Sequence, residues 1–86
     1  MVLATEGGAA LYEESQMINM LVRISRLAAR RWGMSLAQVM RVFVPADALG
    51  YVQRNFALFH MEGDDAVLDD VEEYLAARGV GPDAAQ

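Results

Sequence analysis

The longest regular pattern of apolar positions lies between residues 12 and 32. Apolar side chains recur there at spacings of three and four, at Met17, Leu21, Ile24, Ala28 and Trp32. That period is the one that places side chains on a single face of an α-helix. Two glutamates stand in the first turn and two arginines in the last, which complements the helix dipole at both ends. We therefore expect a long helix with a wide apolar face, ended by Gly33, since glycine readily adopts a left-handed C-terminal conformation.

A second helix is predicted from Leu36 by its start signal. The stretch from Ser35 to Gln38 has the serine and the three-on glutamine of a capping box, in which each side chain satisfies a free backbone N–H. The body of this segment is rich in β-branched residues, but it is short and directly follows a cap, which favours a helix. Pro45 is expected to end it, because a proline restricts the residue before it.

Two more helices are expected in the second half of the chain. Asp47 is a suitable N-cap for a helix from Ala48 to about Asn55. The segment 56–63 is apolar and ambiguous, since it fits a continuing helix, a kink or a short turn.

The last helix is expected between Asp65 and Arg78, with Gly79 as its stop. Its N-cap is either Asp65 or Asp69, because both have an acceptor side chain at a suitable position. The prediction for the whole chain is an all-α fold, a compact bundle of about four helices of which two are short.

Length and composition limit the size of any site. The 86 residues are 55% apolar and include no cysteine, which suits one small domain without disulfides or thiolate metal sites. We expect a flexible N-terminus over 1–11, a helical domain over 12–79 and a flexible tail over 80–86. No secretory signal is recognised, and no apolar run approaches the roughly 20 residues that span a bilayer. A cytoplasmic protein without a membrane partner is the expectation.

Charge is unevenly distributed along the chain. Residues 23–54 hold six arginines and one aspartate, whereas residues 62–83 hold eight acids and one arginine. The simplest interpretation is that the two parts fold against each other or cover the surface. Spacing offers a second interpretation, because arginines three and four apart form a stripe along a helix and can bind carboxylates or phosphates. The candidate interaction residues are Arg23, Arg26, Arg30, Arg31 and Trp32.

No catalytic or metal-binding motif stands out. His60 is the only histidine, and the acids that follow it match no metal-ligand spacing. Phosphate loops, nucleophile elbows and zinc-protease motifs are absent from the sequence. We therefore expect no enzyme activity, no catalytic residue, no cofactor and no metal, and we keep an enzyme or ion site centred on His60 as an alternative.

A DNA-binding regulator is the other alternative. The helix at Ser35, the turn at Pro45 and the polar residues Gln53, Arg54 and Asn55 have a loose helix-turn-helix order. A net charge of −5 opposes the electrostatic footprint of a nucleic-acid-binding domain.

Two short motifs point to a family. They are Leu58-x-His60-x-x-Gly63 and Asp70-Val71-x-x-Tyr74-Leu75, preceded by the middle element Ser35 to Met40. In order and spacing the chain resembles a family of short, uncharacterised bacterial proteins, a domain of unknown function. The resemblance spans about residues 17–79 and implies a helical fold. It also implies a gene neighbour similar to an ADP-ribosyltransferase, and thus an antitoxin or accessory role in a two-gene module.

The matched positions have structural interpretations. Ser35, His60, Gly63, Asp70 and Tyr74 fit the family pattern. A turn at Gly63 and a helix start at Asp70 account for those two residues. The function expected from all of these features is a non-enzymatic interaction module that binds another protein, or a second copy as a homodimer, through apolar surface beside the arginines.

Overall fold

The computed structural model describes the backbone of residues 2–85 and the side chains of residues 11–85. It contains α1 (Val2–Trp32), α2 (Leu36–Ala46), α3 (Ala48–Arg54), α4 (Phe56–Phe59), α5 (Asp64–Ala77) and a 3₁₀ helix, η1 (Pro82–Ala85). No strand occurs between residues 2 and 85. The predicted all-α bundle is confirmed, with five helices of which α3 and α4 are short.

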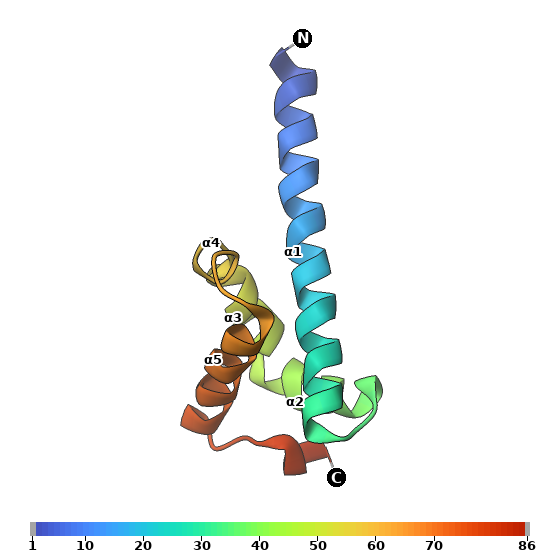
Figure 1. Cartoon of the computed structure of the whole chain (residues 1–86), viewed down its shortest axis with the longest axis vertical. Coiled ribbons are helices and arrows are strands. Elements are labelled where there is room, and N and C mark those ends of the chain that lie inside the picture. The colour runs from blue at the N-terminus through green and yellow to red at the C-terminus, as the bar shows by residue number, and fades with distance from the viewer. Residues whose placement is uncertain (1, 86) are drawn as a thin grey trace.

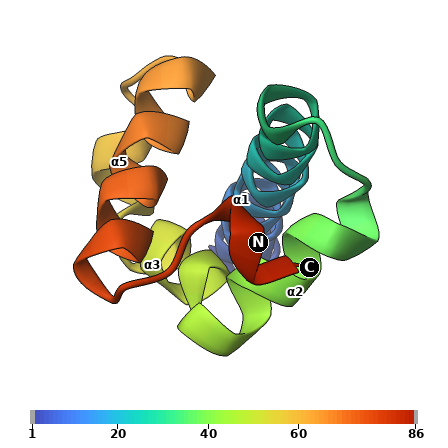
Figure 2. The same cartoon turned by 90° about the horizontal axis from the view of Figure 1, so that it is seen from below.

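The bundle is built around the C-terminal half of α1. This half packs against α2 and α5, with α3 joining the two sides, and the N-terminal half extends beyond the other helices (Figure 1). Viewed from below, α2, α3 and α5 curve around α1 (Figure 2). The helix begins at Val2, ten residues before the predicted start at residue 12. The first residues lack an apolar period, so the pattern that revealed the rest of α1 was absent there.

The core is a single cluster of buried apolar side chains from every helix. Its members are Met20, Ile24, Ala28, Val39, Val42, Phe43, Ala48, Val52, Phe59, Val67, Leu68, Val71, Leu75 and Ala85. Burial of such side chains contributes roughly 25 cal/mol per Å² of apolar surface removed from water. Burial of this cluster is therefore the main contribution to the free energy that holds the helices together.

The start of α2 is the feature that the sequence predicted best. Ser35 Oγ accepts a hydrogen bond from the backbone N–H of Gln38 at 3.1 Å, and Gln38 Oε1 accepts one from the backbone N–H of Ser35 at 2.9 Å. The capping box is confirmed. The end differs from the prediction, because α2 continues through Pro45 to Ala46. A proline in the last turn removes only one hydrogen bond, and α2 is closed instead by Asp47.

Asp47 joins α2 to α3 in a way that the sequence did not indicate. Its φ of 56° is left-handed, and its backbone N–H donates to the carbonyls of Phe43 and Val44 at the end of α2. The predicted N-cap hydrogen bond to α3 is wrong, because the Asp47 side chain makes no such bond. Its carboxylate binds Arg54 at 3.0 Å instead.

The predicted start of the last helix also needs correction. α5 begins at Asp64 with Gly63 in the N-cap position, so Asp65, Asp69 and Asp70 are all inside the helix. Asp70 is therefore not a helix start. Gly63 forms the turn that was expected, with extended backbone that needs no left-handed residue. Gly33 and Gly79 have φ of 63° and 70°, which confirms the two predicted glycine stops.

The C-terminal segment packs on the bundle. Residues 82–85 form η1, which contacts α2 and buries the Ala85 side chain. The expectation of a flexible tail over 80–86, based on composition alone, did not include this packed segment, and residue 86 lies outside the described residues. Among the described residues, no helix is long and apolar enough to cross a bilayer.

Candidate functional site

Two of the predicted interaction arginines bind acids of α5. Arg23 Nε lies 3.1 Å from Asp64 Oδ2. Arg31 Nη1 lies 2.6 Å from Asp69 Oδ1 and 2.8 Å from Glu72 Oε1, and its Nη2 lies 3.2 Å from Asp65 Oδ1. These contacts join the basic part of the chain to the acidic part, as the simpler interpretation of the charge pattern predicted.

Arg31 and Trp32 act together at this contact. The hydrogen bond with Asp69, supported by Glu72, raises the pKa of Arg31 above its ordinary value. Trp32 Nε1 donates to Glu72 Oε2 at 2.8 Å, and its ring meets the ring of Phe43 edge-on at 5.7 Å between centroids. The indole is therefore used within the bundle, between α1, α2 and α5.

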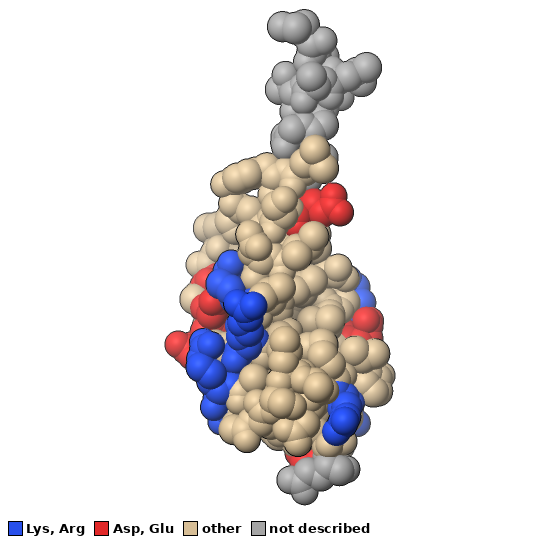
Figure 3. Space-filling view, turned by 90° about the vertical axis from the view of Figure 1, so that its right-hand side faces the viewer, with Lys and Arg blue, Asp and Glu red and all other residues tan. Residues whose placement is uncertain are grey.

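Arg26 and Arg30 are placed differently. Both are exposed on α1, and neither forms an ion pair with any side chain between residues 11 and 85. Figure 3 shows a row of arginines along one side of the molecule and, beside it, a broad area without charged side chains. Of the predicted stripe, these two arginines are the ones without an ion pair among residues 11–85.

An apolar groove lies next to Arg26. It is formed where α1, α2 and α3 meet, encloses about 340 Å³, and is lined by Leu21, Val22, Ser25, Arg26, Leu36, Met40 and Leu49. The hydroxyl of Ser25 donates to the backbone carbonyl of Leu21 at 2.7 Å, so its hydrogen is already used. The groove therefore offers a ligand apolar contacts almost everywhere, with one cation at its edge.

The apolar surface continues along α1 beyond the groove. Leu11 is 65% exposed, Ile18 is 53% exposed and Val22 is 40% exposed. Spacings of seven and four place these three side chains on one side of the helix. Ile18 and Val22 are not among the apolar positions that defined the predicted inward face. Leu11, Ile18 and Val22 form a second apolar period, distinct from the one through Ile24 and Ala28. That second period is the sequence signal for a separate, exposed apolar face.

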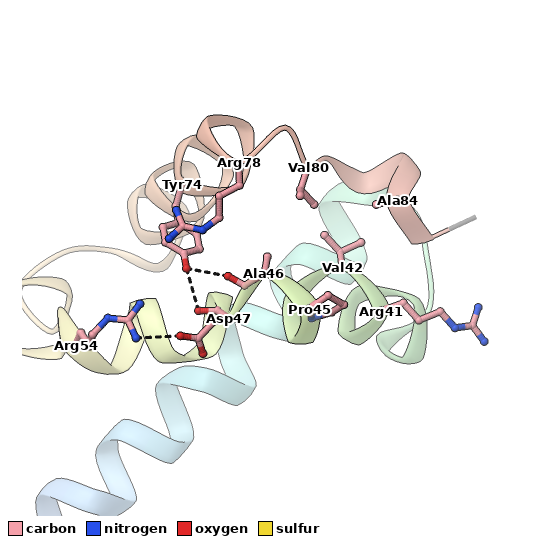
Figure 4. Close-up of a pocket in the computed structure, with 10 residues that line it drawn as sticks. All are labelled: Arg41, Val42, Pro45, Ala46, Asp47, Arg54, Tyr74, Arg78, Val80 and Ala84. Atoms are coloured by element: carbon pink, nitrogen blue, oxygen red, sulfur yellow. Dashed lines mark hydrogen bonds and ion pairs between the residues drawn. The ribbon is translucent and has the colours of Figure 1, made fainter.

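A second cavity of about 670 Å³ lies between α2, α5 and η1 (Figure 4). The Tyr74 hydroxyl donates to the Ala46 carbonyl at 2.8 Å, and the Arg78 guanidinium lies 3.8 Å above the Tyr74 ring centroid. Arg54 is held by Asp47, while Arg41 points away from the cavity. The polar side chains of this cavity thus mainly join α5 to the junction of α2 and α3.

The remaining candidates are separate from the groove. His60 is exposed at the end of α4 with its ring 5.5 Å from that of Phe56. Within residues 11–85, no group of three histidine or acidic side chains is arranged to hold a metal ion. Of the polar residues considered for DNA contact, Arg54 binds Asp47, and Asn55 Nδ2 donates to the Tyr51 carbonyl at 2.8 Å.

Comparison with known proteins gives one match. A search of curated proteins and a search of solved structures each found no match. The family model described as "Protein of unknown function (DUF3791)" matches residues 19–78, from the middle of α1 to the end of α5. That range includes the groove and the contact between α1 and α5. Because the match covers well over half of the chain, the protein belongs to the DUF3791 family of unknown function.

Proposed function

We propose that this protein is a non-enzymatic interaction module that binds another protein chain in the groove between α1, α2 and α3. The observation that carries the proposal is the groove itself, which is lined by apolar side chains of three helices together with Arg26. Exposed apolar surface of this kind costs free energy in water and is typical of binding sites. A protein segment that covers Leu36 and Val22 removes that cost.

The shape and charge of the groove favour a helical segment as the ligand. An amphipathic helix binds such a surface with apolar side chains spaced three and four apart. Arg26 and Arg30 suit carboxylates on the flank of that helix, because a guanidinium binds a carboxylate through paired N–H donors.

A more specific role follows from the family resemblance. We propose that the protein acts as the antitoxin or accessory member of a two-gene module, with a product similar to an ADP-ribosyltransferase as its partner. The resemblance supports this assignment. Co-expression with the neighbouring gene tests it, because a true pair elutes as a stoichiometric complex, whereas separate elution of the two proteins rejects this partner.

The groove is tested by affinity capture with a matched pair of variants. Leu36→Glu places a charge in the groove, and because residue 36 opens α2, a glutamate there is compatible with the helix. Leu58→Glu makes the same change at a position on α4 that is 59% exposed and lies outside the groove. Tagged proteins are used as bait in native lysate after nuclease treatment, at low and high salt.

The expected result is a stoichiometric protein that the native chain and Leu58→Glu retain and that Leu36→Glu loses. Retention by Leu36→Glu would contradict the proposed site. A protein that the native chain retains from untreated lysate but loses after nuclease treatment would contradict direct protein binding and favour the nucleic-acid alternative.

A further inference from the structure

We propose that the segment bound in the groove is α1 of a second copy of this chain, in an antiparallel helix pair centred near position 20. This inference rests on the proposed function, because it assigns an occupant to the same groove. Three observations support it: the spacing of side chains on the exposed side of α1, the extension of α1 beyond the bundle, and the distribution of charge along that helix.

The exposed side of α1 has the spacing of a helix-pairing seam. Its exposed positions, Leu11, Ser15, Ile18 and Val22, alternate between steps of four and three. The same steps continue to Ser25, which is buried but lines the groove, and to the partly buried Ala29. Steps of four and three keep side chains aligned with a second helix, as in a coiled coil. From Leu11 to Val22 this seam is separate from the core side of α1, which holds Met20, Ile24 and Ala28. Over that stretch the helix has one face packed in the bundle and another with exposed apolar side chains.

The seam is complementary to itself when reversed. A two-fold axis at position 20 places Ile18 of each copy opposite Val22 of the other, so the two most central apolar residues meet. The same axis places Ser15 at the level of Ser25, a small buried residue that lines the groove. Further out, it places the large Leu11 opposite the small Ala29. A large side chain facing a small one allows close packing, and an interface of this kind satisfies the symmetry of a homodimer.

The extension of α1 gives the second helix access to the groove. The N-terminal half of α1 lies beyond the other helices (Figure 1), and in the part of the chain whose side chains are described its seam residues Leu11 and Ser15 are exposed. In the antiparallel pair this half runs alongside residues 22–32 of the other copy. The N-terminal half of α1 therefore reaches the groove walls at Leu36 and Met40. Leu36 is 45% exposed and Met40 is partly exposed. Each copy supplies a helix to the groove of the other.

Charge favours the antiparallel arrangement over the parallel one. The N-terminal half of α1 carries Glu13 and Glu14, and every arginine of this helix is in the C-terminal half. Reversal brings the acidic half of each copy to the level of Arg26 and Arg30 in the other. A parallel pair would place like charges at the same level, which is unfavourable at separations shorter than the Debye length of about 8–10 Å.

The oligomeric state tests the pairing. Sedimentation equilibrium over a range of concentrations is expected to show a dimer for the native chain. Ile18→Glu places a charge at the centre of the seam and is expected to weaken the dimer on the order of 100-fold, because burial of an unpaired charge is costly. Leu58→Glu is the control, since it introduces the same charge at a similarly exposed leucine on α4. Circular dichroism checks that both variants retain the helices.

The orientation is tested by spin-label distances. The chain has no cysteine, so Tyr12→Cys and Asn19→Cys each provide one labelling position per copy, on an exposed part of α1 outside the seam. In the antiparallel pair the two labels at residue 12 are separated by about 24 Å along the axis, whereas those at residue 19 are separated by about 3 Å, from a rise of 1.5 Å per residue. In a parallel pair in register, the two labels have no separation along the axis at either position.

The outcomes separate this inference from the proposed function. A longer distance at residue 12 than at residue 19, together with loss of the dimer in Ile18→Glu, supports the antiparallel pair. A monomer at all concentrations, a dimer that Ile18→Glu leaves intact, or equal distances at both positions overturns it. If the protein is a monomer but a different protein is captured through Leu36, the proposed function stands and only the inference about its occupant fails.

Discussion

Arg31 makes three of the four ion pairs between α1 and α5 among the described residues. Its side chain is 29% exposed and binds three acids of α5, namely Asp65, Asp69 and Glu72. Those acids lie three and four positions apart, so they share one side of the helix and repel one another when the cation is absent. A single exposed ion pair contributes little, but one arginine shared by three carboxylates forms a small network and contributes more.

Arg31→Gln is therefore expected to lower the free energy of unfolding by about 1 kcal/mol at low salt. The reason is that the acids of α5 lose their common cation. Urea denaturation in 50 mM and 1 M NaCl measures this effect, which should shrink at high salt because the Debye length falls to about 3 Å. Arg30→Gln is the control, since Arg30 has no ion pair within residues 11–85, and an equal loss in both variants would contradict the assigned role.

Glu62 provides a prediction about pH. Partial loss of hydration, followed by the nearby Asp70 carboxylate, raises the pKa of Glu62 above its ordinary value of 4.5. The folded state then binds the proton of the Glu62 carboxyl more tightly than the unfolded state does. The contribution of Glu62 to stability therefore falls as pH rises through the raised pKa of the folded state. Glu62→Gln is expected to raise the midpoint of thermal unfolding at pH 7 and to leave it unchanged at pH 3. An equal increase at both pH values would show that charge is not the cause.

The junction of α2 and α3 shows how two residues determine the shape of an element. A Cβ atom added to Gly50 would lie 2.3 Å from Asp47 Oδ1, so the carboxylate occupies the space of the missing side chain. In most helices a change from glycine to alanine stabilises by about 1 kcal/mol. In this helix the gain depends on Asp47, whose left-handed backbone positions that carboxylate.

Gly50→Ala is expected to give no gain, or a loss, in the native chain, because the Asp47 carboxylate must move away from Arg54. In an Asp47→Gly background, Gly50→Ala is expected to stabilise by up to about 1 kcal/mol, since the clash is gone. Urea denaturation of the two single variants and the double variant completes the cycle. Equal effects of Gly50→Ala in both backgrounds would contradict the proposed coupling.

Local signals predicted the helices well and the contacts between them poorly. The capping box at Ser35 and the glycine stops at Gly33 and Gly79 depend only on neighbouring residues, so the sequence was sufficient. The use of Asp47 depends on Arg54 and on the missing side chain of Gly50, which a cap pattern does not include. Helix signals are local in sequence, and the cap of α3 was predicted wrongly because the Asp47 side chain binds Arg54.

The candidate site was predicted in part for the same reason. Spacing identified the arginine stripe, but spacing alone did not distinguish Arg31, which binds α5, from Arg26, which lines the groove. The groove itself joins Val22 of α1 to Leu36 of α2 and Leu49 of α3. The groove depends on how three helices pack against one another, and the residue pattern within one helix does not indicate that packing.

The two ends of the described backbone have opposite relations to the bundle. The N-terminal half of α1 extends away from the other helices, whereas η1 at the C-terminal end packs on α2 (Figures 1 and 2). A domain of this size buries a modest share of its surface, so a short segment that covers core residues contributes measurably to stability. The buried side chain of Ala85 is the contact through which η1 joins the core cluster.

Ala85→Asp is expected to lower the free energy of unfolding by about 1–2 kcal/mol, because the carboxylate must either be buried without a partner or force η1 away from α2. Ala84→Asp is the matched control, since Ala84 belongs to the same 3₁₀ helix and is exposed. Urea denaturation measures both. A lower stability for Ala85→Asp alone shows that η1 is part of the folded domain. Equal stability of the two variants and the native chain would show instead that the domain ends with α5 and that η1 adds nothing to its core.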